Sequence, residues 1–117
     1  MSKNSTFVEN VVEQLVGVER LAVRRMFGGF GIYRAGVMFA LVFDDRLYFK
    51  VNVANKPDYQ EAGSAPFIYD RHSKDKAAKT IALSYWEVPA HVFEDRDLMF
   101  QWMIKSYEAA LQTKAAK

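Results

Sequence analysis

The chain has 117 residues and no cysteine, half of its residues are hydrophobic, and its formal net charge is +2. This length fits one domain, residues 1–117, with a core of its own; the lack of cysteine excludes disulfides, thiol nucleophiles and thiolate metal sites and favours a reducing compartment, the cytoplasm. The longest apolar run, 36–43, is far shorter than the ~20 residues of a membrane-spanning helix, and the polar start lacks the apolar core of a secretory signal, so no membrane contact is expected.

The first predicted element is an amphipathic helix near the N-terminus. Its apolar residues between positions 7 and 16 recur at helical spacing and form one stripe that faces a core. Ser5 is expected to cap the start of this helix, and Gly17 to end it in a left-handed conformation. Glutamates on the polar face do not favour a membrane-surface role.

Three glycines, Gly28, Gly29 and Gly31, interrupt the next segment. One strand is predicted from Leu21 to about residue 27, and a second over 30–33. Glycines at this spacing resemble a phosphate-binding loop, but such loops lead from a strand into a helix, whereas here the chain continues as a strand. We therefore predict a tight turn or bulge between two paired strands.

The segment 37–43 is apolar at every position, which is typical of a strand covered on both faces at the centre of a sheet. Asp44-Asp45 is predicted to form a hairpin turn; the alternative, a metal site or acid–base pair, lacks a third acidic residue nearby. The following strand, 46–53, alternates between an apolar and a polar face. Its apolar face consists of Leu47, Phe49, Val51 and Val53.

A short helix follows, with Asn55 as its N-cap and Gly63 at its end. Further strands are predicted at 67–71 and 80–88. The loop between them, 71–79, carries four permanent positive charges against one negative charge and no large apolar residue, so it is expected to be exposed.

The final predicted helix spans 96–112, with Asp95 as its N-cap and a frayed end at 113–117. Its apolar residues are spread so widely that its polar face narrows to Gln101, Lys105, Glu108 and Gln112. One sheet face should not bury so much apolar surface. The helix therefore packs between two layers, or part of it meets another molecule.

Together these elements predict an α+β fold. An antiparallel β-meander sheet of about five to six strands is flanked by an N-terminal and a C-terminal α-helix, with a short helix in the middle. The prediction requires the strands on either side of the glycine turn to pair edge to edge. It also requires 37–43 to have a strand on each side.

Catalytic chemistry finds little support in the sequence. His72 lies in the basic loop and His91 in a turn after Pro89, far apart along the chain, and no nucleophile motif surrounds Ser73 or Ser84. Metal-ligand spacing is absent as well. We therefore expect neither an enzyme nor a cofactor; an active site assembled only by the fold is the alternative.

A basic surface is the first candidate binding site. Residues 20–79 carry eleven basic against six acidic residues (11 − 6 = +5), which indicates a polyanion-facing surface or, as the more ordinary interpretation, a solvated charged surface. If the cations converge, they could hold a nucleic-acid backbone without reading bases. The candidate residues are Arg24, Arg25, Lys50, Lys56, Arg71, Lys74, Lys76 and Lys79.

An apolar surface is the second candidate. It comprises whichever face of 37–43 the helices leave uncovered, together with Phe100, Ile104 or Trp86. Such a surface predicts a homodimer, or a protein partner, that contacts the exposed sheet face or the C-terminal helix.

The string from Arg24 to Tyr33, R-R-M-F-G-G-F-G-I-Y, resembles the N-terminal domain of the TfoX/Sxy family. The residues at 36–40, 47–51 and 82–85, together with Phe67, extend the resemblance over nearly the whole chain. The resemblance implies an antiparallel sheet flanked by helices near both termini. The better-known members of the family regulate genes for natural competence and DNA uptake, as coactivators alongside the cyclic-AMP receptor protein at promoters.

Full-length regulators of this family carry a second, C-terminal helical domain, whereas this chain ends at Lys117, so a stand-alone N-terminal domain is expected. The resemblance implies a cytoplasmic regulatory domain that contacts DNA or a transcription factor. The competing interpretation is a homodimeric protein-interaction module without nucleic-acid contact. The family offers no settled catalytic residues to transfer, and a structural role is favoured for the glycines.

Overall fold

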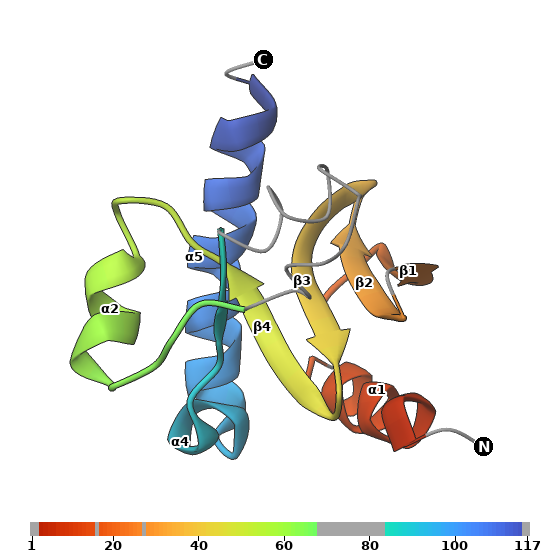
Figure 1. Ribbon diagram of the computed structural model, residues 1–117. Coiled ribbons are helices and arrows are strands. Elements are labelled where there is room, and N and C mark those ends of the chain that lie inside the picture. The colour runs from red at the N-terminus through yellow and green to blue at the C-terminus, as the bar shows by residue number, and fades with distance from the viewer. Residues whose placement is uncertain (1–2, 16, 27, 68–83, 116–117) are drawn as a thin grey trace.

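The computed structural model describes residues 3–15, 17–26, 28–67 and 84–115 and shows a five-stranded antiparallel sheet with helices at both ends of the chain (Figure 1). The strands lie side by side in their order along the chain, so the sheet is a meander, and the predicted α+β fold is confirmed. The strands are β1 (Leu21–Met26), β2 (Gly29–Arg34), β3 (Val37–Phe43), β4 (Arg46–Lys50) and β5 (Tyr85–Glu87). The helices are α1 (Lys3–Gln14), α2 (Lys56–Glu61), α4 (Ala90–Phe93) and α5 (Arg96–Ala115).

The main core lies between one face of the sheet and the helices. In Figure 1, α5 runs upright behind β4, and α1 lies beneath the lower end of the sheet. Apolar residues of α1, α4 and α5 meet the sheet there, and the stripe predicted on the N-terminal helix points toward it. Its fully buried members include Val11, Ile32, Phe39, Phe49, Val92, Met99 and Met103.

The central strand β3 contains a bulge that changes which residues face the helices. Ile32 of β2 pairs with Ala40, while the next residue, Tyr33, pairs with Met38, so Phe39 has no partner on β2. Phe39 and Ala40 therefore both join the helix-side core, and Met38 and Leu41 lie on the opposite face. The prediction of a central strand covered on both faces is confirmed, but its two faces are not divided by strict alternation.

Two tight hairpins join the central strands. Asp44 and Asp45 have φ angles of 52° and 57°, and Ala35 and Gly36 have φ angles of 50° and 82°. Two successive residues with positive φ match the type I′ turn, whose twist suits antiparallel strands. The hairpin predicted at Asp44-Asp45 is confirmed.

The segment after β4 departs from the predicted strand. β4 ends at Lys50, and Val53 is 90% exposed instead of lying on the core face. The reason is a turn in which the Asn52 side-chain oxygen accepts hydrogen bonds from the backbone N–H groups of Ala54 (3.0 Å) and Asn55 (3.3 Å). Such a side-chain turn competes with continued strand pairing.

Asn55 is the N-cap residue of α2, as predicted, but its side chain does not cap the helix. The buried amide accepts a hydrogen bond from the backbone N–H of Asn52 at 2.8 Å and donates one to the carbonyl of Lys50 at 3.1 Å. The Asn55 side chain therefore forms hydrogen bonds with the backbone that leaves β4, and not with the N–H groups at the start of α2.

The two terminal helices differ from the predicted boundaries. α1 begins at Lys3, so Ser5 lies inside the helix instead of capping it. Asp95 caps α5 as predicted, because its Oδ1 accepts hydrogen bonds from the backbone N–H groups of Asp97 (2.9 Å) and Leu98 (3.2 Å). α5 then continues to Ala115, beyond the predicted end at 112.

The apolar surface of α5 is only partly covered by the sheet. Its inner side packs on β3 and β4, and Trp102 on its flank meets the buried Tyr59 of α2 with ring centroids 4.7 Å apart. The Tyr59 hydroxyl lies 3.3 Å from the buried Ser106 hydroxyl, which ties α2 to α5, and burial raises the Tyr59 pKa well above its ordinary value. On the outer side, Phe100 (48%) and Leu111 (40%) are exposed.

Several predictions fall on residues outside the described ranges. These are the strand 67–71 beyond Phe67, the basic loop 71–79, and the first part of the strand 80–88. In the parts that are described, residues 65–67 pair with the outer edge of β5: Phe67 N–H donates to the Tyr85 carbonyl at 2.7 Å. No helix among these residues is long and apolar enough to cross a membrane.

Candidate functional site

The sheet face that points away from the helices carries a second, smaller cluster of side chains. We call it the tyrosine face, because three of its members are tyrosines on β2, β4 and β5. Every strand from β1 to β5 contributes at least one side chain to it, so it spans the whole sheet. Its members are Met26, Tyr33, Met38, Leu41, Phe43, Tyr48, Phe67 and Tyr85.

Aromatic packing holds the centre of the tyrosine face. The Phe67 ring meets those of Phe43 and Tyr48, with centroids 5.3 Å and 4.8 Å apart. The Tyr85 hydroxyl donates to the Met38 carbonyl at 3.3 Å. Burial raises the pKa values of Tyr48 and Tyr85 above the ordinary phenol value, so both stay neutral near pH 7.

Two of the predicted cations lie on the tyrosine face, at different places. The Arg24 guanidinium on β1 lies over the Tyr33 ring, 5.3 Å from its centroid. The Lys50 ammonium on β4 donates to the Ser84 hydroxyl at 2.8 Å and lies 5.4 Å from the Tyr85 ring centroid. Three strand spacings, about 14 Å, separate β1 from β4. Each cation is therefore held against a tyrosine, one on either side of the cluster.

The other two described cations lie elsewhere. Arg25 follows Arg24 in the strand and so points to the opposite face, where its guanidinium lies 5.6 Å from the Phe30 ring centroid. Lys56 of α2 lies 5.7 Å from the ring centroid of Trp86, which also belongs to the helix side. The remaining predicted site residues, Arg71, Lys74, Lys76 and Lys79, lie outside the described ranges.

No binding role was predicted for three further residues, two that contact the candidate cations and one cation on the other face of the sheet. Tyr33 and Ser84 position the two cations, and Arg34, on the helix side of the sheet, lies 4.9 Å from the Tyr107 ring centroid. In the strand register Arg25 faces Phe30 and Lys50 faces Tyr85, whereas Arg24 faces Gly31 and reaches Tyr33 diagonally. Which aromatic residue each cation meets depends on strand register, which the sequence alone does not fix.

The described residues offer no constellation for metal or acid–base chemistry. No group of three or more His, Asp or Glu side chains in these ranges could hold a metal ion. His91 is exposed on α4, with its ring 6.4 Å from that of Trp102, and His72 is not described.

A surface hollow of about 300 Å³ lies between α1 and the start of α5. Three of the residues that line it bond to one another: the Gln14 amide donates to the Phe93 carbonyl at 2.7 Å, and Arg96 Nε donates to Gln14 Oε1 at 3.3 Å. These bonds tie α1 to the α4–α5 connection, which gives the hollow a structural explanation.

A family model described as the TfoX N-terminal domain matches residues 13–110, which cover the sheet, the tyrosine face and most of α5. The chain belongs to the TfoX N-terminal domain family. Comparison with curated proteins gave no significant match.

The glycine motif of this TfoX N-terminal domain has a structural role. Gly28 has a φ of +80° in the turn between β1 and β2. A Cβ at Gly29 would collide with the backbone carbonyl oxygen of Val42, and one at Gly31 would approach the Met26 and Met38 sulfur atoms to 2.5 Å and 2.7 Å. The glycines thus let β2 lie close against β3 and make room for the methionines of the tyrosine face.

Proposed function

We propose that this TfoX N-terminal domain is a cytoplasmic, non-enzymatic regulatory domain, linked to transcriptional control of competence and DNA transformation through contact with DNA or a transcription factor. Family membership supports the regulatory class. The observation that carries the proposal of DNA contact is the placement of Arg24 and Lys50, which are held against tyrosines on the same sheet face.

The proposed contact is with the DNA backbone. A guanidinium stacked on a ring keeps its N–H groups in the plane that meets a phosphate, and a strand lysine supplies a point charge. Phosphate contacts of this kind position a duplex without reading its sequence. Of the other predicted cations, the loop residues Arg71, Lys74, Lys76 and Lys79 belong to the proposed contact set, whereas Arg25 and Lys56 lie on the helix side of the sheet.

A salt titration tests this contact. With a short labelled duplex of mixed sequence, the logarithm of the binding constant should fall linearly with the logarithm of salt concentration, by about 0.9 per phosphate neutralised. Arg24→Ala and Lys50→Ala should each reduce the slope by about one. Reversing the charges of the 71–79 loop with Lys74→Glu and Lys76→Glu should weaken binding further. Fluorescence anisotropy measures all of these values.

The matched control is Lys105→Ala. Lys105 carries the same charge but lies on α5, where its ammonium pairs with Asp58 at 2.9 Å. Its removal should leave the salt slope unchanged. The proposed contact would be contradicted by a binding constant that does not change with salt concentration. It would also be contradicted if Lys105→Ala weakened binding as much as Lys50→Ala does.

A homodimeric protein-interaction module without nucleic-acid contact is the second candidate function. It is favoured by Phe100 and Leu111, which are exposed on α5. Eleven residues make about three helical turns, so both lie on one side of the helix, with the half-buried Ile104 between them. Light scattering should then detect a dimer, and a strict monomer at high protein concentration would count against it.

A further inference from the structure

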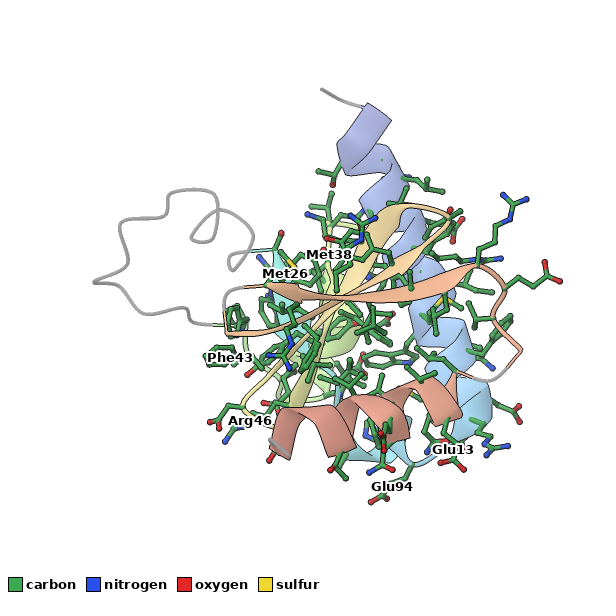
Figure 2. The ribbon with its side chains drawn as sticks, turned by 90° about the vertical axis from the view of Figure 1, so that its right-hand side faces the viewer. Glu13, Met26, Met38, Phe43, Arg46 and Glu94 are labelled. Atoms are coloured by element: carbon green, nitrogen blue, oxygen red, sulfur yellow. The ribbon has the colours of Figure 1, made fainter. Side chains whose placement is uncertain are left out.

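The outer edge of β1 carries no strand in the described parts of the chain. Among the described strands β1 pairs with β2 alone, whereas the other end of the sheet, β5, is bridged by residues 65–67. The four residues 22–25 are exposed. In Figure 1 β1 forms the right-hand rim of the sheet, and in Figure 2 it crosses the front of the molecule above α1.

The register shows which backbone groups reach this edge. Arg20 and Ala35 continue the pairing of β1 with β2, and the Ala35 N–H donates to the Arg20 carbonyl at 3.0 Å. Hydrogen-bonded pairs alternate along an antiparallel ladder. The groups of residues 22, 24 and 26 therefore bond to β2, and the N–H and C=O groups of Leu21, Val23 and Arg25 point outward.

The two arginines of β1 leave these outward groups accessible. Charged side chains often protect an edge strand by blocking it. Here the guanidinium groups instead lean back over β2, Arg24 over Tyr33 on one face and Arg25 over Phe30 on the other. Next to them on the edge, Val23 is 37% exposed and offers an apolar contact.

Charge decides what kind of strand fits this edge. Residues 20–26 contain three arginines and no acidic residue. Two copies paired through β1 would bring six arginines together without a counter-charge, and like charges across a strand pair are destabilising. An acidic strand would instead place its carboxylates beside guanidinium groups that still have donors available in the ring-stacked position.

We propose that the open edge of β1 binds an extended acidic segment of a partner protein, which adds to the sheet as an antiparallel strand. Because Arg25 and Arg24 lie on opposite faces, two consecutive acidic residues of the partner would meet one guanidinium each. The residue after them would lie beside Val23, and the one two further along beside Leu21. The edge therefore selects the order acidic, acidic, apolar, any residue, apolar. This binding does not depend on the proposed DNA contact.

The probe is a labelled synthetic peptide, Gly-Asp-Glu-Val-Thr-Val-Gly, and its control is a peptide of the same composition in shuffled order. Val23→Pro removes an outward N–H without removing a bond to β2, and proline is tolerated at such edge positions. It should weaken binding of the probe by about tenfold or more, because a ladder hydrogen bond is lost and the ring obstructs the edge. Val23→Thr keeps the N–H and should bind as the original protein does. Circular dichroism and anisotropy measure fold and affinity.

A charge exchange tests the same edge without proline. The double variant Arg24→Glu, Arg25→Glu should no longer bind the acidic probe. It should instead bind the basic peptide Gly-Lys-Lys-Val-Thr-Val-Gly. The proposal is overturned if the shuffled peptide binds as well as the probe, if folded Val23→Pro binds unchanged, or if the double variant shows no exchange of preference. If the protein is a dimer and Val23→Pro makes it a monomer, the β1 edge binds a second copy of this chain, and the proposal of an acidic partner segment is overturned. Duplex binding by Val23→Pro should stay unchanged, so this proposal and the DNA contact fail separately.

Discussion

Replacing Gly29 with alanine is expected to lower the free energy of unfolding by about 3 kcal/mol, at the upper end of the usual cost of overpacking. The added Cβ would collide with the Val42 carbonyl oxygen, which belongs to the backbone of the central strand. Since Phe30 pairs with Val42, the collision can be relieved only by moving β2 away from β3. Urea denaturation followed by circular dichroism measures the change.

Gly36→Ala is the matched control for this prediction. Gly36 has a φ of +82°, but nothing lies within 4 Å of an added Cβ. Its substitution should cost only the left-handed strain of alanine, about 1 kcal/mol. Equal losses of stability in the two variants would show that β2 and β3 do not approach closely at Gly29.

Replacing Phe39 with alanine is expected to cost about 4 kcal/mol, within the range for a fully buried aromatic side chain. Phe39 is the bulge residue of β3, and its ring meets Phe49 (centroids 6.0 Å apart) and Tyr107 (6.4 Å) in the helix-side core. Removal leaves a cavity beneath α5 that these rings cannot fill without moving the helix. Thermal and urea denaturation should both show the loss.

Phe100→Ala makes the same chemical change at an exposed position of α5. Its cost should stay below about 1 kcal/mol, since surface substitutions rarely exceed that. If Phe39→Ala were as mild as Phe100→Ala, then Phe39 would not point into the core and the bulge would be misplaced.

The sheet could be predicted because its signals are local. An apolar run, a pair of turn-forming aspartates and a glycine interruption each specify a strand or a turn within a few residues. The bulge at Phe39 could not be predicted, because it arises from how β2 pairs with β3 and no residue pattern in either strand indicates it. The ending of β4 was missed for a related reason. The side-chain bonds of Asn52 and Asn55 outweigh the alternation that continues to Val53.

The candidate site was predictable in part. That Arg24 and Arg25 point to opposite faces follows from strand alternation alone. That Arg24 shares a face with Lys50 depends on the register of four strands, and that Lys56 reaches Trp86 depends on how α2 packs on the sheet. The cations could therefore be named from the sequence, but which cations of different elements share a face could not.

An NMR titration of backbone amides with a short DNA duplex tests the central claim, that the basic tyrosine face is the side of this domain that meets a polyanion. The account predicts the largest shifts at Arg24, Tyr33, Lys50 and Ser84, with the amides of Phe100 and Leu111 unmoved. Shifts confined to α5, or no shifts at low salt, would contradict it.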